Sequence, residues 1–224
     1  MQTVQEKFRA AVQEPDYQRP AKKPIYSFFK RLFDIVLCSL ALIVLSPLFL
    51  VVAILIKRED GGPVFFSQTR LTKDGRAFQM FKFRSMCPNA EVQLDDLMEQ
   101  NEMDGIIFKM LDDPRITKIG KKLRKSSIDE LPQLINVIKG DMSIVGPRPP
   151  VLREVEEYTP YHMRRLDVKT GLACYRECYG RSNIKSLDEW VESDLKYIRE
   201  RNLLTDLKVI LLTIKVVITG DGAM

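Results

Sequence analysis

The sequence predicts a mainly helical protein of the α/β (α+β) class, in which one membrane element is attached to a small soluble domain. Residues 35–56 form a run of 22 positions without a charged residue, and 19 of them are apolar. The whole chain of 224 residues is 45% hydrophobic and 29% charged, which is ordinary for a globular domain. After the run, several segments show the apolar spacing of helices, and one pair shows the alternation of strands.

The apolar run is long enough to cross a bilayer, because 22 helical residues cover about 33 Å. Its centre holds Ser46-Pro47, where Pro47 removes a backbone donor and clashes with the carbonyl group of Ile43. Positive charge on both sides selects no crossing direction. We therefore expect a re-entrant membrane hairpin over 25–58 that breaks at Ser46-Pro47, and a single span with a proline kink stays open. The flanking basic residues are Lys22, Lys23, Lys30, Arg31, Lys57 and Arg58.

Composition disfavours several protein classes. Four cysteines (Cys38, Cys87, Cys174 and Cys178) are too few for a disulfide scaffold, and the single histidine disfavours a zinc site. A secretory signal fits poorly, because its positive region would be over thirty residues long here and no small-residue cleavage site follows the apolar run. The net charge of +5 suits anionic membrane lipids better than nucleic acid once a membrane segment is present. We expect the soluble domain, 59–224, to lie in the cytoplasm.

The remaining segments have simpler patterns. Residues 1–24 are polar and contain three prolines, so we expect a mobile or surface-lying tail. Segments 64–70 and 77–86 alternate apolar and polar residues around the turn Lys73-Asp74-Gly75, which predicts a β-hairpin. Residues 88–104 predict an acidic amphipathic helix.

The C-terminal segment 203–218 is apolar but is interrupted by Asp206, Lys208 and Lys215. It is too short and too charged to span a membrane. A core helix and an amphipathic helix in the interface plane with snorkelling lysines both stay open.

The densest chemical signal lies in residues 123–149. Ser127 with Glu130 matches a helix capping box, and Pro132 fits the first turn of a helix that starts near Asp129. Asp129-Glu130 would then lie at a positive helix end, where acids are also common for structural reasons alone.

Cations on either side favour a functional interpretation of the Asp129-Glu130 pair. Arg124 and Lys125 precede it, and Arg148 follows in a Gly-Pro-Arg-Pro segment with a rigid backbone. Carboxylates, cations and a helix N-terminus together are typical of a site for a phosphate-bearing substrate and a divalent metal. In that field we expect the Asp129 carboxylate to stay ionised, as a nucleophile or metal ligand must.

The chain resembles the monotopic phosphoglycosyl transferases, a family of bacterial sugar transferases, in their minimal form. The resemblance runs from about Arg31 to Gly222. It is carried by "KRLFDIVLCSLALIVLSPLFLVVAILIK", "GGPVFFSQTRLTKDGRAFQMFKFRSM", "DDPRITKIGKKLRKSSIDELPQLINVIKGDMSIVGPRP" and "DLKVILLTIKVV". It implies transfer of a sugar-1-phosphate from a UDP-sugar to undecaprenyl phosphate. It also implies a Ser-Pro-broken anchor in the bacterial inner membrane, with the catalytic domain on the cytoplasmic face.

The resemblance implies roles for individual residues. Asp129 would be the nucleophile, forming an aspartyl-phosphosugar and releasing UMP, with Mg²⁺ bound near it, while Glu130 would handle protons or the metal. Lys82, Arg124 and Arg148 are candidates for phosphate contacts. Arg84 shares a face with Lys82 if 77–86 is a strand, although ordinary strand-face charge is an equal alternative. Asp194 and Asp206 resemble acids in the C-terminal helices of the family, and structural ion pairing stays open for both.

One segment departs from the family pattern. Where many relatives carry a Pro-Gly-Ile-Thr-Gly-Trp-like stretch, residues 169–183 read "KTGLACYRECYGRSN", which leaves the donor sugar undetermined. The expected function is the first membrane step of glycoconjugate synthesis, such as exopolysaccharide, O-antigen or capsule. Two alternatives remain: an inactive membrane-anchored scaffold and a metal-dependent nucleotide-sugar phosphohydrolase. A homodimer also stays open.

Overall fold

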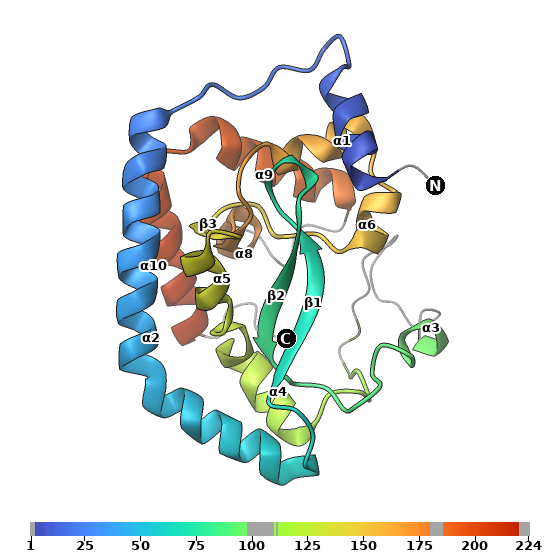
Figure 1. The fold of residues 1–224 in the computed structure, drawn as a ribbon, viewed down its shortest axis with the longest axis vertical. Helices are drawn as coiled ribbons and strands as arrows, with labels where there is room; N and C mark the ends of the chain where they lie inside the picture. Colours follow the sequence, from blue (N-terminus) through green and yellow to red (C-terminus); the bar gives the residue numbers. More distant parts are fainter. Residues whose placement is uncertain (1–2, 98–109, 111, 180–185, 220–224) are drawn as a thin grey trace.

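The computed structural model describes residues 3–97, 110, 112–179 and 186–219. Helices surround two small two-stranded sheets, which confirms the mainly helical class (Figure 1). The helices are α1 (Val4–Val12), α2 (Pro24–Asp60), α3 (Leu94–Leu97), α4 (Lys118–Lys125), α5 (Gln133–Lys139), α6 (Leu152–Glu156), α7 (Pro160–Met163), α8 (Tyr175–Tyr179), α9 (Leu187–Glu200) and α10 (Leu203–Thr219). The strands are β1 (Phe65–Leu71), β2 (Ala77–Phe83), β3 (Ser143–Val145) and β4 (Gly171–Ala173). Short 3₁₀ turns are η1 (Lys73–Gly75), η3 (Ile128–Glu130) and η4 (Arg164–Asp167).

The hairpin of β1 and β2 confirms the alternation read from the sequence. The strands pair antiparallel from Phe65 opposite Phe83 to Leu71 opposite Ala77. Asp74 and Gly75 adopt φ values of 58° and 72° in the connecting turn, a conformation that Gly and Asp tolerate best. The hairpin is the rigid element that carries the cationic side chains described below.

The second sheet pairs β3 and β4 in parallel and fixes the segment that follows β3. Gly146 donates its N–H to the Ala173 oxygen at 3.0 Å, and Gly171 donates to the Pro147 oxygen at 2.8 Å. A Cβ on Gly171 would lie 2.0 Å from the Gly146 nitrogen, so the backbones approach too closely for any side chain. This contact holds the Gly-Pro-Arg-Pro segment against β4.

The long helix α2 continues through Pro47, whereas the sequence predicts a break there. The Ser46 hydroxyl donates to the Ile43 oxygen at 2.8 Å, so it bonds the carbonyl group that Pro47 leaves without its usual donor. The helix bends along its length instead of reversing as a hairpin (Figure 1). Among the described residues, α2 is the one helix long and apolar enough to cross a bilayer.

Both arms of α2, residues 24–46 and 47–60, pack on the same soluble body. In the first arm, Cys38 joins a buried cluster with residues of β2 and α5. In the second arm, Val52 and Ile56 pack with Phe83 and Leu123. The two ends of the bent helix therefore return to one domain.

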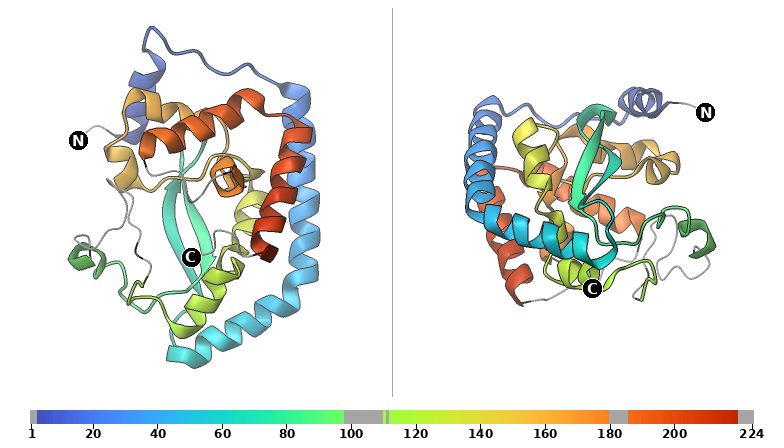
Figure 2. Two further views of the ribbon diagram at one scale, coloured as in Figure 1. Left: turned by 180° about the vertical axis from the view of Figure 1, so that it is seen from behind. Right: turned by 60° about the horizontal axis from the view of Figure 1, so that its bottom comes forward.

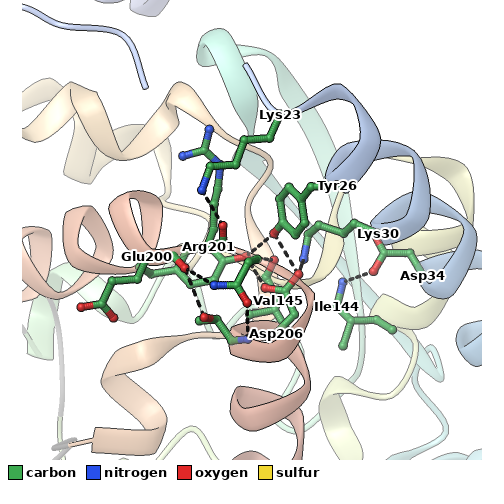
Figure 3. A network of polar contacts seen from close by, with 12 residues as sticks. Lys23, Tyr26, Lys30, Asp34, Ile144, Val145, Glu200, Arg201 and Asp206 are labelled. Atoms are coloured by element: carbon green, nitrogen blue, oxygen red, sulfur yellow. Dashed lines mark hydrogen bonds and ion pairs between the residues drawn. The ribbon is translucent and has the colours of Figure 1, made fainter. Parts of the chain in front are cut away.

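A polar network ties the start of α2 to the C-terminal helices (Figure 3). Asp206 of α10 accepts hydrogen bonds from Tyr26 and Lys30 at 2.8 Å each, and a third from Tyr197 at 2.8 Å. The contacts of Asp206 hold α10 alongside α2, as both Figures 1 and 2 show. Further along α2, Asp34 accepts a hydrogen bond from the Ile144 backbone N–H of β3 at 3.0 Å.

Helix α10 is a core helix on one face and exposes apolar side chains on the other. Val209 is fully buried in the core, together with residues of β3, β4 and α9. The opposite side presents large apolar side chains to the outside, as does most of α2. The exposed apolar residues of α10 are Leu203, Leu204, Leu207, Leu211, Ile214 and Val217.

Residues 4–12 of the tail expected over 1–24 form a helix that lies on the soluble body. Thr3 and Glu6 form a capping box at the start of α1, whose Phe8 and Ala11 are 4% and 1% exposed. These side chains pack against Leu71, Tyr158 and their neighbours. Apolar residues at helical spacing thus find a tertiary partner more than 140 positions away. The predicted acidic helix over 88–104 is wrong for residues 88–93, which form turns; α3 covers Leu94–Leu97, and residues 98–104 lie outside the described part.

Candidate active site

The Asp129-Glu130 pair lies on η3, one turn before α5. The predicted capping box does not form, because Ser127 has φ 55° and its side chain makes no capping hydrogen bond. Pro132 has no N–H to donate, and the turn before it closes through bonds three residues apart, from Glu130 to Ser127 and from Leu131 to Ile128. Helix α5 starts at Gln133 with Pro132 at its N-cap, and not near Asp129 as the sequence predicts.

Lys82 of β2 joins the two carboxylates. Its Nζ lies 2.7 Å from Glu130 Oε1 and 3.8 Å from Asp129 Oδ2. Asp129 is buried, with 6% of its surface exposed, whereas Glu130 is partly exposed. The fold thus brings together three residues that the sequence separates by nearly fifty positions.

Burial raises the pKa of the Asp129 carboxyl above its ordinary value, and the nearby Glu130 adds to that effect. The charges of Lys82 and Arg124 act in the opposite direction and offset it only in part. An additional cation at the pair would favour the ionised form.

Arg124 is positioned by the close approach of α4 to the end of β2. A Cβ on Gly120 would lie 1.9 Å from the Ser85 oxygen, so only glycine lets the helix lie there. Arg124 Nε donates to the Ser85 hydroxyl at 3.0 Å. Burial lowers the pKa of Arg124, and the charge of Asp129 counteracts this, which places the two groups in one electrostatic environment.

A small pocket lies beside the carboxylate pair, and three cationic side chains line it. It is lined by Lys82 and Glu130, by Gln133 of α5, and by Arg148. The third cation is Arg70 of β1, which sequence reasoning missed. Because side chains alternate along paired strands, Arg70 lies on the same face of the hairpin as Lys82, and extending that alternation to β1 identifies it.

Arg84 is not brought to this pocket. Its guanidinium makes a two-pronged ion pair with Asp60 at the end of α2 and donates through Nε to the Pro63 oxygen at 2.6 Å. A Cβ added to Gly62 would meet that guanidinium at 2.8 Å. Arg84 therefore connects the hairpin to the membrane helix.

The two C-terminal acids have structural partners. Asp194 is 1% exposed and lies 2.5 Å from the equally buried Arg165, which also donates to the Arg148 backbone oxygen at 3.2 Å. Burial raises the pKa of Asp194 to about 6, with Arg165 acting against it. Asp206 attaches α10 to α2, as described above. Neither residue lines the pocket, and each holds together elements that surround it.

The donor atoms suit Mg²⁺ only in part. No group of three or more His, Cys, Asp or Glu side chains that could hold a metal occurs within the described segments. Mg²⁺ is usually bound by one or two carboxylates together with waters and substrate phosphate oxygens. Asp129 and Glu130 supply the two carboxylates, so the residues present fit a metal that arrives with a diphosphate.

Comparison with known proteins identifies the family to which this arrangement belongs. Residues 25–220 match the family described as bacterial sugar transferase. The chain belongs to the bacterial sugar transferase family. The match begins with α2 and includes both sheets, the Asp129-Glu130 pair and the pocket, and it confirms the family resemblance noted in the sequence.

Some curated relatives are longer than this chain, and others have a similar length. The galactosyl transferase CpsE of Streptococcus agalactiae is 50% identical over 196 residues, 87% of this chain and 43% of its own length. The exopolysaccharide production protein ExoY of Sinorhizobium fredii is 41% identical over 207 residues, 91% of each chain. The UDP-glucose:undecaprenyl-phosphate glucose-1-phosphate transferase of Escherichia coli is 37% identical, over 89% of this chain and 42% of its own length. This member of the family thus spans less than half of two relatives and nearly all of the third.

Proposed function

We propose that this protein transfers a sugar-1-phosphate from a UDP-sugar to undecaprenyl phosphate, with Asp129 as the nucleophile. The observation that carries the proposal is the buried carboxylate of Asp129 close to Lys82, next to Glu130, which lines a pocket with three cationic side chains. Several relatives are named as sugar-phosphate transferases with undecaprenyl phosphate as the acceptor. The exopolysaccharide role of ExoY supports a place in glycoconjugate synthesis.

The proposed reaction has two displacements at one phosphorus. A carboxylate oxygen of Asp129 attacks the phosphorus nearest the sugar, and the bond from that phosphorus to the oxygen of the leaving UMP breaks. A phosphate oxygen of undecaprenyl phosphate then attacks the same phosphorus, which breaks the bond to Asp129 and regenerates its carboxylate. Every partner is anionic, so Lys82, Arg124 and Arg148 offset the repulsion.

A Mg²⁺ ion would be held by Asp129 with Glu130, and when bound it supplies further positive charge next to the diphosphate. Lys82 contacts both carboxylates and keeps them paired with a cation before substrate arrives. Glu130 is the more exposed acid and is suited to handling protons or the metal.

The apolar exteriors of α2 and α10 support attachment to the bacterial inner membrane, with the site on the cytoplasmic face. Large apolar side chains are exposed along both helices, and the two lie side by side. Both arms of α2 end on the same soluble body, which favours entry and exit on one side of the bilayer. The bend at Ser46-Pro47 would then be the deepest part of the anchor.

The test is UMP release from a panel of UDP-sugars, with and without undecaprenyl phosphate, for the wild type and Asp129→Asn. We expect release that depends on the acceptor, and at least a 1,000-fold loss in the variant, since the nucleophile is removed. Asp112→Asn is the matched control, because Asp112 is an exposed acid remote from the pocket.

Three outcomes would contradict the proposal. Equal UMP release without the acceptor would indicate a phosphohydrolase. Absence of release with every donor, in a folded and membrane-bound protein, would indicate a scaffold. Full activity of Asp129→Asn would exclude Asp129 as the nucleophile while leaving the transfer itself intact.

A further inference from the structure

Three arginine side chains lie around the indole ring of Trp190 on α9. Trp190 is 2% exposed, so its ring is almost wholly enclosed by protein. The guanidinium carbon of Arg176 lies 3.9 Å from the ring centre, that of Arg165 5.1 Å, and that of Arg148 5.9 Å. At these distances a cation is attracted to the face of an aromatic ring. Arg148 of the pocket therefore belongs to a cluster that continues behind the pocket wall.

The three arginines contribute in different ways. Arg165 pairs with Asp194 and donates to the Arg148 backbone oxygen, so it holds the main chain of the Gly-Pro-Arg-Pro segment. That backbone contact leaves the direction of the Arg148 side chain unspecified. The indole ring is one surface against which this side chain lies, and Arg148 also lines the pocket. Arg176 does not line the pocket and reaches it through Trp190.

Arg176 is carried by a segment that is fixed on α9. Helix α8 begins two residues after β4, the strand paired with β3. Its first residue, Tyr175, is 6% exposed, packs edge-on against Tyr197 with 5.4 Å between ring centres, and donates to Glu200 at 2.9 Å. Arg176 follows directly, so the backbone that carries it is held in place. It also lies within 169–183, the segment that departs from the family pattern.

The stack acts on Arg148 through packing and through charge. A guanidinium 3.9 Å from the ring centre restricts rotation of the indole, which in turn limits where the Arg148 side chain can lie. Like charges repel, so Arg176 disfavours movement of Arg148 further onto the ring. Burial raises the pKa of the Asp194 carboxyl, and the charges of all three arginines act against that effect, which places them in one electrostatic environment.

We propose that Arg176 is a positioning residue for Arg148: stacked on Trp190, it holds the indole ring and directs the Arg148 guanidinium toward the pocket. The proposal rests on the proposed function, in which Arg148 offsets the negative charge of the diphosphate. It gives the divergent segment 169–183 a physical connection to the active site. It predicts that Arg176 matters for binding a diphosphate only while Arg148 is present.

A double-mutant cycle tests this dependence. Binding of UDP in the presence of Mg²⁺ is measured by calorimetry on the full chain in nanodiscs. We expect Arg148→Ala to weaken UDP by about 10- to 100-fold, since a charged hydrogen bond is lost. Arg176→Ala should weaken it by about 3- to 30-fold, the range of a buried cation–π contact. In the Arg148→Ala background, Arg176→Ala should change the Kd by less than about 2-fold, because coupled residues are not additive.

Two further variants separate positioning from a general effect on the fold. Arg176→Lys keeps the charge but loses the flat guanidinium that stacks on the ring, so its UDP affinity should lie between those of the wild type and Arg176→Ala. Arg199→Ala is the control on the same helix as Trp190, because Arg199 is exposed and pairs with Glu192, and its Kd should equal that of the wild type. If Arg176→Ala does not fold, Arg176→Lys in both backgrounds decides the question.

The outcomes distinguish this proposal from the proposed function. An equal loss of UDP affinity in both backgrounds would mean that Arg176 serves only the fold, and unchanged or tighter binding by Arg176→Ala would also overturn the positioning role. Coupled binding without transfer from any UDP-sugar would overturn the proposed function and leave the positioning of Arg148 standing. Transfer by the wild type without coupling would do the reverse.

Discussion

Arg70 and Arg84 are buried to nearly the same extent at opposite ends of one β-hairpin, 8% and 7% exposed, yet their partners differ in charge. Arg84 faces the carboxylate of Asp60, whereas Arg70 faces only neutral oxygens. Accordingly, Asp60 raises the pKa of Arg84, while burial and Arg148 lower that of Arg70 to about 10.

The difference shows that burial alone does not reveal the role of a charged side chain. Arg84 forms a complete ion pair, which connects the end of α2 to the start of the catalytic body. Arg70 has two hydrogen bonds to neutral oxygens and is influenced by the charges of Glu154 and Glu130 without a direct ion pair among the described residues. The contrast can be tested through stability.

The largest stability effect is expected for Arg165→Gln, which extends the comparison to a wholly buried pair. Arg165 and Asp194 are each 1% exposed, so the change leaves a buried carboxylate without its cation. We expect a loss of about 3 to 5 kcal/mol, seen as a fall in Tm of about 10 °C. Arg199→Gln, which removes an exposed pair with Glu192, is the control and should change stability by less than about 1 kcal/mol.

A smaller loss is expected for Arg84→Gln. Asp60 keeps a quarter of its side-chain surface in solvent, so the unpaired acid is partly hydrated. We expect a loss of about 2 to 3 kcal/mol, below the range for a wholly buried pair. In thermal unfolding, the double variant Asp60→Asn/Arg84→Gln should recover part of this loss. A variant as stable as the wild type would remove the basis for treating Arg84 as structural.

The smallest stability effect is expected for Arg70→Gln. One hydrogen bond is lost, but an uncompensated buried charge is removed as well, so the free energy of unfolding should change by about 1 kcal/mol or less. A stability loss as large as that of Arg84→Gln would mean that Arg70 serves the fold, and the two arginines would no longer differ.

Local pattern was sufficient for some elements. The β1–β2 hairpin was predictable because strict alternation and a Lys-Asp-Gly turn agree with each other. The Asp129-Glu130 pair was singled out by its local pattern and Lys82 by the family resemblance, and the fold brings them into contact. For the hairpin and the acidic pair, the information lies within a few neighbouring residues.

Other features depend on partners distant in sequence. Helix α1 has a capping box and apolar residues at helical spacing, but its burial requires a surface formed by residues 155–166. Arg70 becomes significant only when the register places it on the same face as Lys82. Ser127, just after α4, is left-handed and does not cap the next helix, since a 3₁₀ turn precedes α5, which starts at Gln133.

The packing of α2 has a practical consequence for isolating the protein. Two of the hydrophobic clusters contain residues from this helix, with Cys38 in one and Val52 and Ile56 in the other. Deleting the apolar helix to obtain a water-soluble fragment would uncover Phe83, Leu123 and their neighbours. The catalytic body is therefore expected to need its anchor, and a detergent or lipid environment, to be purified in folded form.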